Sequence, residues 1–137
     1  MRVRHALRQI AGVTLLGLAL PVAAAAQFGH PLVGQWTGDW GSRDKPTRIL
    51  LNLTWDGTAV SGEVNPGPNA LKITRTTIDY SDPASWVVKM AAEGTSAGKP
   101  VSVTVDGRLE NIGVYRRIFR GTWTQNGQKG EFVVTRN

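Results

Sequence analysis

Apolar residues alternate with polar ones over short stretches of this chain, as they do in β-strands with one buried face. The odd-numbered residues from Ile49 to Trp55 are apolar, and a period of two is the repeat of a half-buried strand. Further short stretches of this kind are bounded by Gly, Pro, Asn, Asp or Ser, and no segment of the mature chain has a convincing helical period. We therefore predict an all-β domain with eight strands, at 33–40, 49–55, 60–64, 71–78, 86–92, 101–109, 117–125 and 130–136.

Most of the connections between these stretches are short enough to be hairpins, which favours antiparallel neighbours. Asp56-Gly57 fits a two-residue type I′ turn, in which both central residues have positive φ. Eight such strands lose their exposed edges most simply by closing into an up-and-down barrel. A two-sheet β-sandwich is the alternative architecture.

An up-and-down order assigns each aromatic residue to one end of the barrel. One end, which we name the floor, is predicted to collect Trp36, Trp55, Trp86, Phe119 and Arg136. The opposite end, the mouth, collects Trp40, Trp123 and Phe132. Gly38, Gly62 and Gly121 are predicted to face the barrel interior, where the lack of a side chain lets an aromatic ring lie against the backbone.

Gly34 and Trp36 at the start of the first strand, with Arg136 at the end of the last, resemble the structural signature of the lipocalin and wider calycin barrels. In that family the tryptophan plugs the closed end of the barrel and the arginine packs across it. The resemblance thus implies structural roles for Gly34, Trp36 and Arg136, with a cation–π contact between the last two. It also implies a barrel that binds a small ligand.

The first 26 residues have the pattern of a secretory signal peptide: Arg2, Arg4 and Arg8, then an apolar run, then an Ala-rich cleavage region. The predicted organisation is a signal peptide at 1–26, a flexible segment at 27–32 and the barrel domain at 33–137. The alternative is a membrane anchor, but the apolar run is at the short limit for one. We expect export to the periplasm or the extracellular medium, with no membrane span after cleavage.

Cleavage of the predicted signal peptide changes the net charge of the mature protein. Removing residues 1–26 takes away three of the 16 Lys and Arg residues and none of the 10 acids, so the net charge falls from +6 to +3. The remaining charges are interleaved, so nucleic acid is not an expected partner. The chain has no cysteine, and the domain must be held together by burial alone.

The sequence carries no recognisable catalytic, cofactor or metal motif, so we expect no cofactor and no metal. The only histidine of the mature chain, His30, is interpreted as a solvated residue of the N-terminal segment. Asp79 and Asp82 fit turn chemistry. Arg116, Arg117 and Arg120 are interpreted as a solvated charged turn, with an anion site as the alternative.

Three functional hypotheses follow. In the first, the mouth binds a small amphiphile with an anionic head, through Trp40, Trp123 and Phe132 below a basic rim that includes Arg43 and Lys99. In the second, the barrel is solid, and its outer surface meets an envelope protein or a cell-wall polymer; Leu50, Val87 and Val133 would then form an exposed apolar patch. The third is a hydrolase of unknown specificity.

Overall fold

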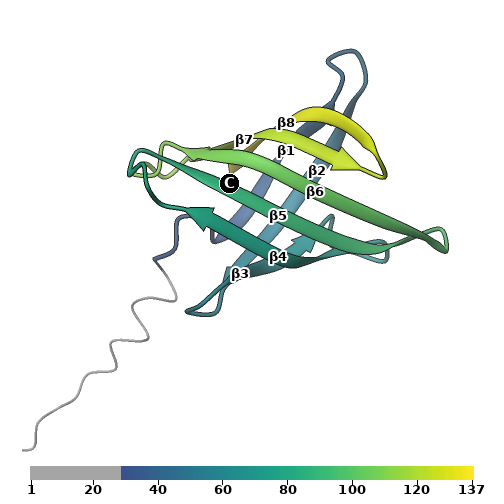
Figure 1. Ribbon diagram of the computed structural model, residues 1–137. Coiled ribbons are helices and arrows are strands. Elements are labelled where there is room, and N and C mark those ends of the chain that lie inside the picture. Colours follow the sequence, from purple (N-terminus) through teal and green to yellow (C-terminus); the bar gives the residue numbers. More distant parts are fainter. Residues whose placement is uncertain (1–28) are drawn as a thin grey trace, which may run out of the picture.

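A computed structural model describes residues 29–137, so the predicted signal peptide lies outside the described residues. The chain forms a closed antiparallel barrel in which strands adjacent in sequence are adjacent in space and the last pairs with the first (Figure 1). The strands are β1 (Gly34–Gly41), β2 (Pro46–Trp55), β3 (Val60–Val64), β4 (Leu71–Asp79), β5 (Ser85–Ser96), β6 (Lys99–Glu110), β7 (Ile118–Gln125) and β8 (Gln128–Arg136). The predicted all-β barrel is confirmed, and the sandwich alternative is wrong. Between residues 29 and 137 no helix is long and apolar enough to cross a membrane.

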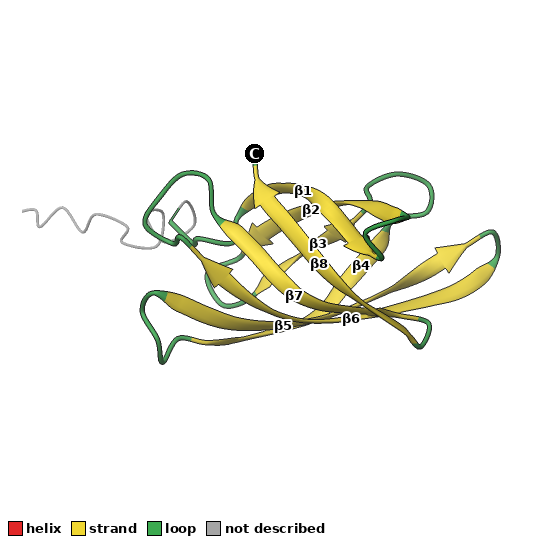
Figure 2. Ribbon diagram, turned by 90° about the horizontal axis from the view of Figure 1, so that it is seen from above, coloured by secondary structure: helices red, strands yellow, loops and turns green. Residues whose placement is uncertain are grey.

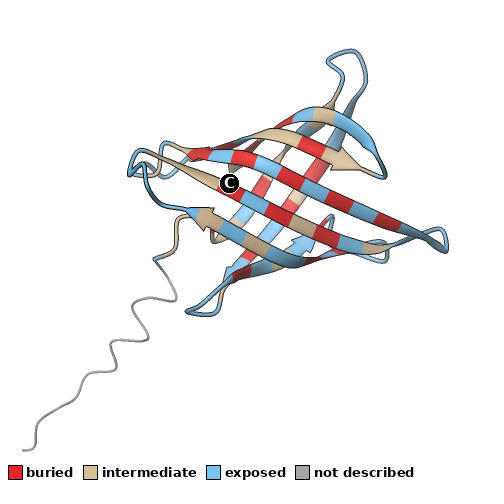
Figure 3. Ribbon diagram, viewed as in Figure 1, coloured by how far each residue is buried: buried red, intermediate tan, exposed pale blue. Residues whose placement is uncertain are grey.

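Burial alternates along the strands as the hydrophobic pattern predicts (Figure 3). In β6, every second residue from Val101 to Leu109 is buried, and the residues between them are exposed. The buried side chains from all eight strands form one core inside the barrel. β5 and β6 are the longest strands, and their hairpin projects beyond the other strands at the mouth (Figure 2).

The hairpin turns differ from the prediction in one place. The connections at Ala97-Gly98 and Asn126-Gly127 have positive φ at both residues, as type I′ turns require. At Asp56-Gly57 only Gly57 has positive φ, so the predicted type I′ turn is wrong. There the Asp56 carboxylate accepts the backbone N–H groups of Thr58 and Ala59, both at 2.7 Å, and closes a longer connection.

Gly107 of β6 and Gly121 of β7 are directly paired, so neither strand places a side chain inside the barrel at this point. A Cβ atom on Gly107 would lie 2.6 Å from a ring carbon of Phe119 and 2.8 Å from the carbonyl oxygen of Arg120. Aromatic rings therefore occupy the room that a side chain at Gly107 would have filled, whereas a Cβ on Gly121 would meet the backbone of Asp106 and Gly107. On the outer face both glycines line a small hollow.

A β-bulge in β4 shifts the register between Ile73 and Arg75. Before the bulge the odd-numbered Ile73 faces inward, opposite Ala92; after it Thr76 pairs with inward-facing Met90. Arg75 and Thr77 therefore lie on the outer face, where an unbroken alternation would have turned them inward.

The close packing at Gly107 predicts a large difference between two glycine substitutions. We expect Gly107→Ala to lower the free energy of unfolding by about 1 to 3 kcal/mol, because the added methyl group meets backbone and aromatic atoms. Gly113→Ala is the matched control, since a Cβ there meets nothing within 4 Å and should change stability by less than about 0.5 kcal/mol. Denaturant unfolding of both variants tests this, and equal effects would contradict the packing argument.

Candidate functional site

The interior of the barrel is filled by a continuous series of aromatic rings. Trp36 contacts Phe119, Phe119 contacts Phe132, Phe132 contacts Trp123, and Trp123 stacks on Trp40, with centroid distances of 6.3, 5.0, 5.9 and 6.0 Å. The first four of these residues are at most 1% exposed. Aliphatic side chains from β2 to β6 complete the same core. The centre of the barrel is therefore occupied by side chains of the protein itself.

At the floor, the residues of the calycin-like signature hold the N-terminal segment. The indole N–H of Trp36 donates to the carbonyl of Leu32 at 2.9 Å, and Nε of Arg136 donates to that of Val33 at 2.8 Å. Trp36 and Arg136 are register partners, and a Cβ on Gly34 would lie 2.9 Å from Nε of Arg136. The structure thus brings the three residues together. The cation–π contact of Arg136 is made with Tyr115, at 5.2 Å, and not with Trp36 as predicted.

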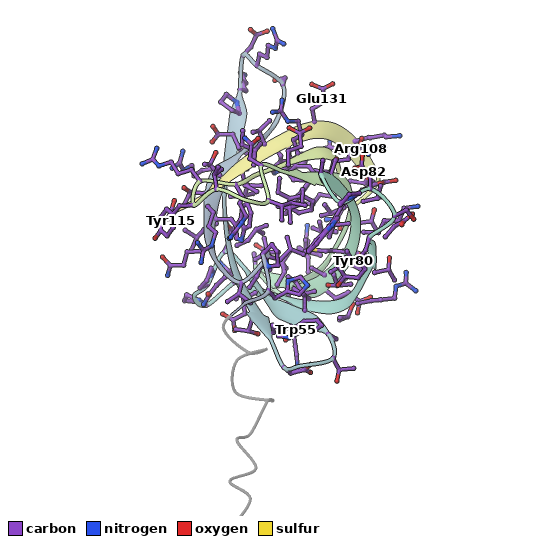
Figure 4. All side chains as sticks on the ribbon, turned by 90° about the vertical axis from the view of Figure 1, so that its left-hand side faces the viewer. Trp55, Tyr80, Asp82, Arg108, Tyr115 and Glu131 are labelled. Carbon is purple, nitrogen blue, oxygen red and sulfur yellow. The ribbon has the colours of Figure 1, made fainter. Side chains whose placement is uncertain are left out.

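The segment before β1 is packed against the floor. Leu32 is fully buried, and the ring of His30 stacks on Trp55 with a centroid distance of 4.4 Å. His30 also lies 5.9 Å from the ring of Trp86. Figure 4 shows the floor end, with Trp55 and Tyr80 on neighbouring parts of its rim. His30 is thus half-buried against the aromatic side chains at the ends of β2 and β5, and is less solvated than the sequence interpretation has it.

Both ring nitrogens of His30 have hydrogen-bond partners. Nδ1 accepts the backbone N–H of Leu32 at 3.2 Å, and Nε2 lies 3.3 Å from the hydroxyl of Tyr80. Nδ1 therefore carries a lone pair, which places the proton of the neutral ring on Nε2. Burial lowers the pKa of His30 below its usual value of 6.5. This arrangement favours the neutral ring, with Leu32 and Tyr80 as its hydrogen-bond partners.

At the mouth, a cleft of about 290 Å³ brings together three of the five residues predicted to bind a ligand: Trp40, Arg43 and Phe132. Trp123 lies behind Trp40 and is 1% exposed. Lys99 does not line the cleft; it lies on the β5–β6 hairpin, which points away from the β1–β2 hairpin that carries Arg43 (Figure 1).

The charge of the mouth cleft differs from the predicted basic rim. Two carboxylates, Asp39 and Glu131, line it beside the single cation Arg43. Asp39 forms an exposed ion pair with Arg48, at 3.8 Å. The lining is thus not positive, and only Arg43 could attract an anionic head group there.

A cleft of about 480 Å³, larger than the mouth cleft, lies on the outside of the barrel. Its base is a row of directly paired residues that runs across β5, β6 and β7: Ala91, Thr104 and Thr124. Arg75 of β4 and Lys129 of β8 stand at the two ends of this row. Short side chains thus form the base of the cleft, and long cationic side chains form its two sides.

A second row, one pleat further along the strands, continues the same cleft. It consists of Thr77, Lys89, Asp106 and Thr122, again directly paired across the sheet. Lys89 and Asp106 form an exposed ion pair at 3.9 Å. The cleft is therefore lined by four threonines, three cations and one carboxylate, together with the apolar residues Met90 and Val105. Sequence reasoning missed this site because its residues are spread over five strands.

Smaller hollows adjoin the main cleft on the same face. One, towards the mouth, shares Thr104 and Thr124 with it, and another, towards the floor, shares Asp106 and Thr122. Together they form what we name the outer groove, which follows β6 and β7 from Ser102 to Glu110. Eight residue steps at about 3.3 Å each give the groove a length of about 26 Å.

The remaining candidate residues do not form sites. Arg117 donates to the carbonyls of Ile112 and Pro31, at 2.9 and 3.2 Å, and Arg120 pairs with Glu110 at 3.0 Å, so the three arginines of the β6–β7 region do not converge on an anion. Val87 and Val133 lie in one cross-strand row but are separated by Arg108 and Arg120. The predicted apolar patch is therefore interrupted. Within residues 29–137 no group of three or more metal-ligating side chains occurs.

The burial of His30 predicts a dependence of stability on pH. Its pKa is lowered in the folded state, so its contribution is complete above about pH 6.5 and is lost as the pH falls below that value. We expect the free energy of unfolding to decrease between about pH 7.5 and about pH 5.5. Denaturant titrations at several pH values measure this decrease.

His30→Phe is the control, because it keeps a ring against Trp55 but does not titrate; its unfolding free energy should change less over this interval. Hydrogen bonds from the backbone N–H of Ala59 and of Thr58 lower the pKa of Asp56, and hydrogen bonds from Ser81 lower that of Asp79. These carboxylates lose their contributions only below their usual pKa of 3.8, outside the interval. An equal decrease in wild type and variant would rule out His30 as the source.

The barrel geometry is consistent with a calycin-like fold, in that eight antiparallel strands close in up-and-down order. Known proteins give no further guide to the site. No protein-family model, no curated protein and no solved structure matches this chain.

Proposed function

We propose that this protein is an exported interaction module whose barrel is solid and whose outer groove binds a polysaccharide strand of the cell envelope or its surroundings. One observation carries the proposal: a cleft of about 480 Å³ lies on the outer face of β4–β8, while aromatic rings occupy the interior. The predicted signal peptide supports export. The calycin-like signature supports a distant relationship to those barrels, with the ligand site moved outside.

The outer groove is suited to hydroxyl-rich ligands. A threonine hydroxyl both donates and accepts hydrogen bonds, as the hydroxyl groups of a sugar do. Four threonines line the main cleft, and a fifth hydroxyl, from Ser102, lies at its mouth-side end. The long, open shape of the groove fits an extended chain better than a compact molecule.

A peptide strand is a poorer match for this face. Peptides that bind sheets usually add a strand to an unpaired edge. Each of β5, β6, β7 and β8 is paired on both sides, so the strands that carry the groove offer no such edge. Arg108 and Arg120 also separate Val87 from Val133 on this face. The face therefore lacks the apolar centre that a stable protein interface needs.

Binding in the outer groove predicts where a bound oligosaccharide perturbs the protein. We expect titration with oligosaccharides of about six units, one neutral and one acidic, to shift the backbone amide NMR signals of Thr104, Thr122 and Thr124. The amide signals of Trp123 and Phe132 inside the barrel should change little. Thr104→Phe places a ring on the base of the groove and should weaken binding by about tenfold.

Thr54→Phe is the matched control, since Thr54 is an exposed outer residue of β2, away from the groove. It should leave the affinity unchanged. The proposal is wrong if neither oligosaccharide shifts the groove amides, or if both threonine variants weaken binding equally.

The mouth cleft is a second candidate, favoured by its grouping of Trp40, Arg43 and Phe132. We propose on this alternative that a small aromatic carboxylate binds there and changes tryptophan emission saturably. Trp40→Phe should remove the change, and Glu131→Gln should strengthen binding, because it removes one of the two carboxylates that repel the ligand. No saturable change at millimolar concentrations would discard the mouth as a site.

A further inference from the structure

The placement of cations along the outer groove points to the class of its ligand. We infer that the groove selects an acidic polysaccharide, whose chain lies along β6 and β7 with its anionic groups directed alternately to the two sides of the groove. This inference rests on the proposed function, because it names the ligand of the same site.

The main cleft has cations on opposite sides. Arg75 of β4 and Lys129 of β8 are separated by the paired residues Ala91, Thr104 and Thr124. Measured along the curved sheet, four strand spacings of about 4.8 Å separate their backbones by about 19 Å. Both long side chains are exposed and line the cleft between them. A chain lying over the threonines would therefore have a cation within reach on either side.

The carboxylates of the groove have cationic partners. Asp106 pairs with Lys89 at 3.9 Å, and Glu110 pairs with Arg120 at 3.0 Å. Among the described residues, no ion pair engages Arg75, Arg108 or Lys129. Arg75 and Lys129 in the main cleft are thus cations outside these ion pairs, and Arg108, which also interacts electrostatically with Asp79, adds a third in the floor-side hollow.

The hydroxyls and the cations have complementary roles. The threonine row supplies short-range hydrogen bonds, which a neutral glycan could also use. The cations supply attraction only to a ligand with carboxylate, sulfate or phosphate groups. Since these cations are exposed, each contributes modestly, and the selectivity arises from several acting on one chain.

The test compares two ligands that differ only in charge. Oligogalacturonate of about six units and its fully methyl-esterified counterpart have the same ring hydroxyls, but the ester lacks the carboxylates. We expect calorimetric titration of the mature protein to show oligogalacturonate binding at least about tenfold more tightly at low salt. The difference should shrink as the ionic strength rises from about 0.05 M to about 0.3 M.

Two variants with the same change in net charge locate the effect. Arg75→Gln, Lys89→Gln, Lys129→Gln removes the three cations of the main cleft, and should bring oligogalacturonate down to the affinity of the ester. Lys45→Gln, Arg48→Gln, Arg116→Gln removes three exposed cations that line neither the outer groove nor the mouth cleft, and should change affinity by less than about twofold. All six positions are exposed, and thermal unfolding checks that both variants fold.

Each of the other outcomes refutes a different part of the proposal. Equal affinity for the acid and its ester refutes the acidic class but leaves the proposed polysaccharide site intact. No binding of either ligand refutes the proposed function itself. Equal loss in the two triple variants shows that net charge, and not the groove, attracts the ligand. Hexaglutamate binding as tightly as oligogalacturonate assigns the groove to acidic peptides instead.

Discussion

The pairing of Gly107 with Gly121 links the inside of the barrel to its outer surface. Eight strands enclose a narrow interior, and the rings of Phe119 and Phe132 lie 2.6 and 2.9 Å from where a Cβ on Gly107 would be, so they need a glycine at that position. At Gly121 a Cβ would meet the backbone of Asp106 and Gly107, so close approach of the two strands needs a glycine there. Both glycines also line a hollow on the outer face, so the same pair borders the filled core and the outer groove.

The floor shows a second way in which aromatic and cationic side chains shape this small barrel. Three consecutive backbone carbonyls, of Pro31, Leu32 and Val33, accept hydrogen bonds from Arg117, Trp36 and Arg136. Side chains from β1, β8 and the start of β7 thus fix a segment that has no strand partner of its own. The buried Leu32 and the stacked His30 then cover the end of the core. In this protein the tryptophan and arginine of the calycin-like signature close the barrel mainly by holding this segment in place.

The strands and their barrel order could be predicted because each depends on local alternation and short connections. The outer groove could not, because Arg75, Thr104 and Lys129 are brought together by a register that crosses five strands. One signal was available: apolar positions in β4 change parity between Ile73 and Ile78, and the bulge that causes this places Arg75 on the outside. The contact of His30 with Trp55 also could not be predicted from the sequence, since no local pattern indicates that an N-terminal segment folds back onto a barrel end.

The position of the cations shows why loop composition was a poor guide to where cations gather on the barrel. Arg43 and Lys99 both lie near the predicted mouth, but they belong to hairpins that diverge, so their charges do not add at one point. Residues on paired strands, in contrast, have fixed neighbours at spacings of about 4.8 Å across the sheet. Cations held by register, such as Arg75 and Lys129, therefore form a pattern that an extended ligand can match with little ordering of the protein on binding. A solid barrel is well suited to this use, since a rigid core keeps the spacing of the outer rows constant.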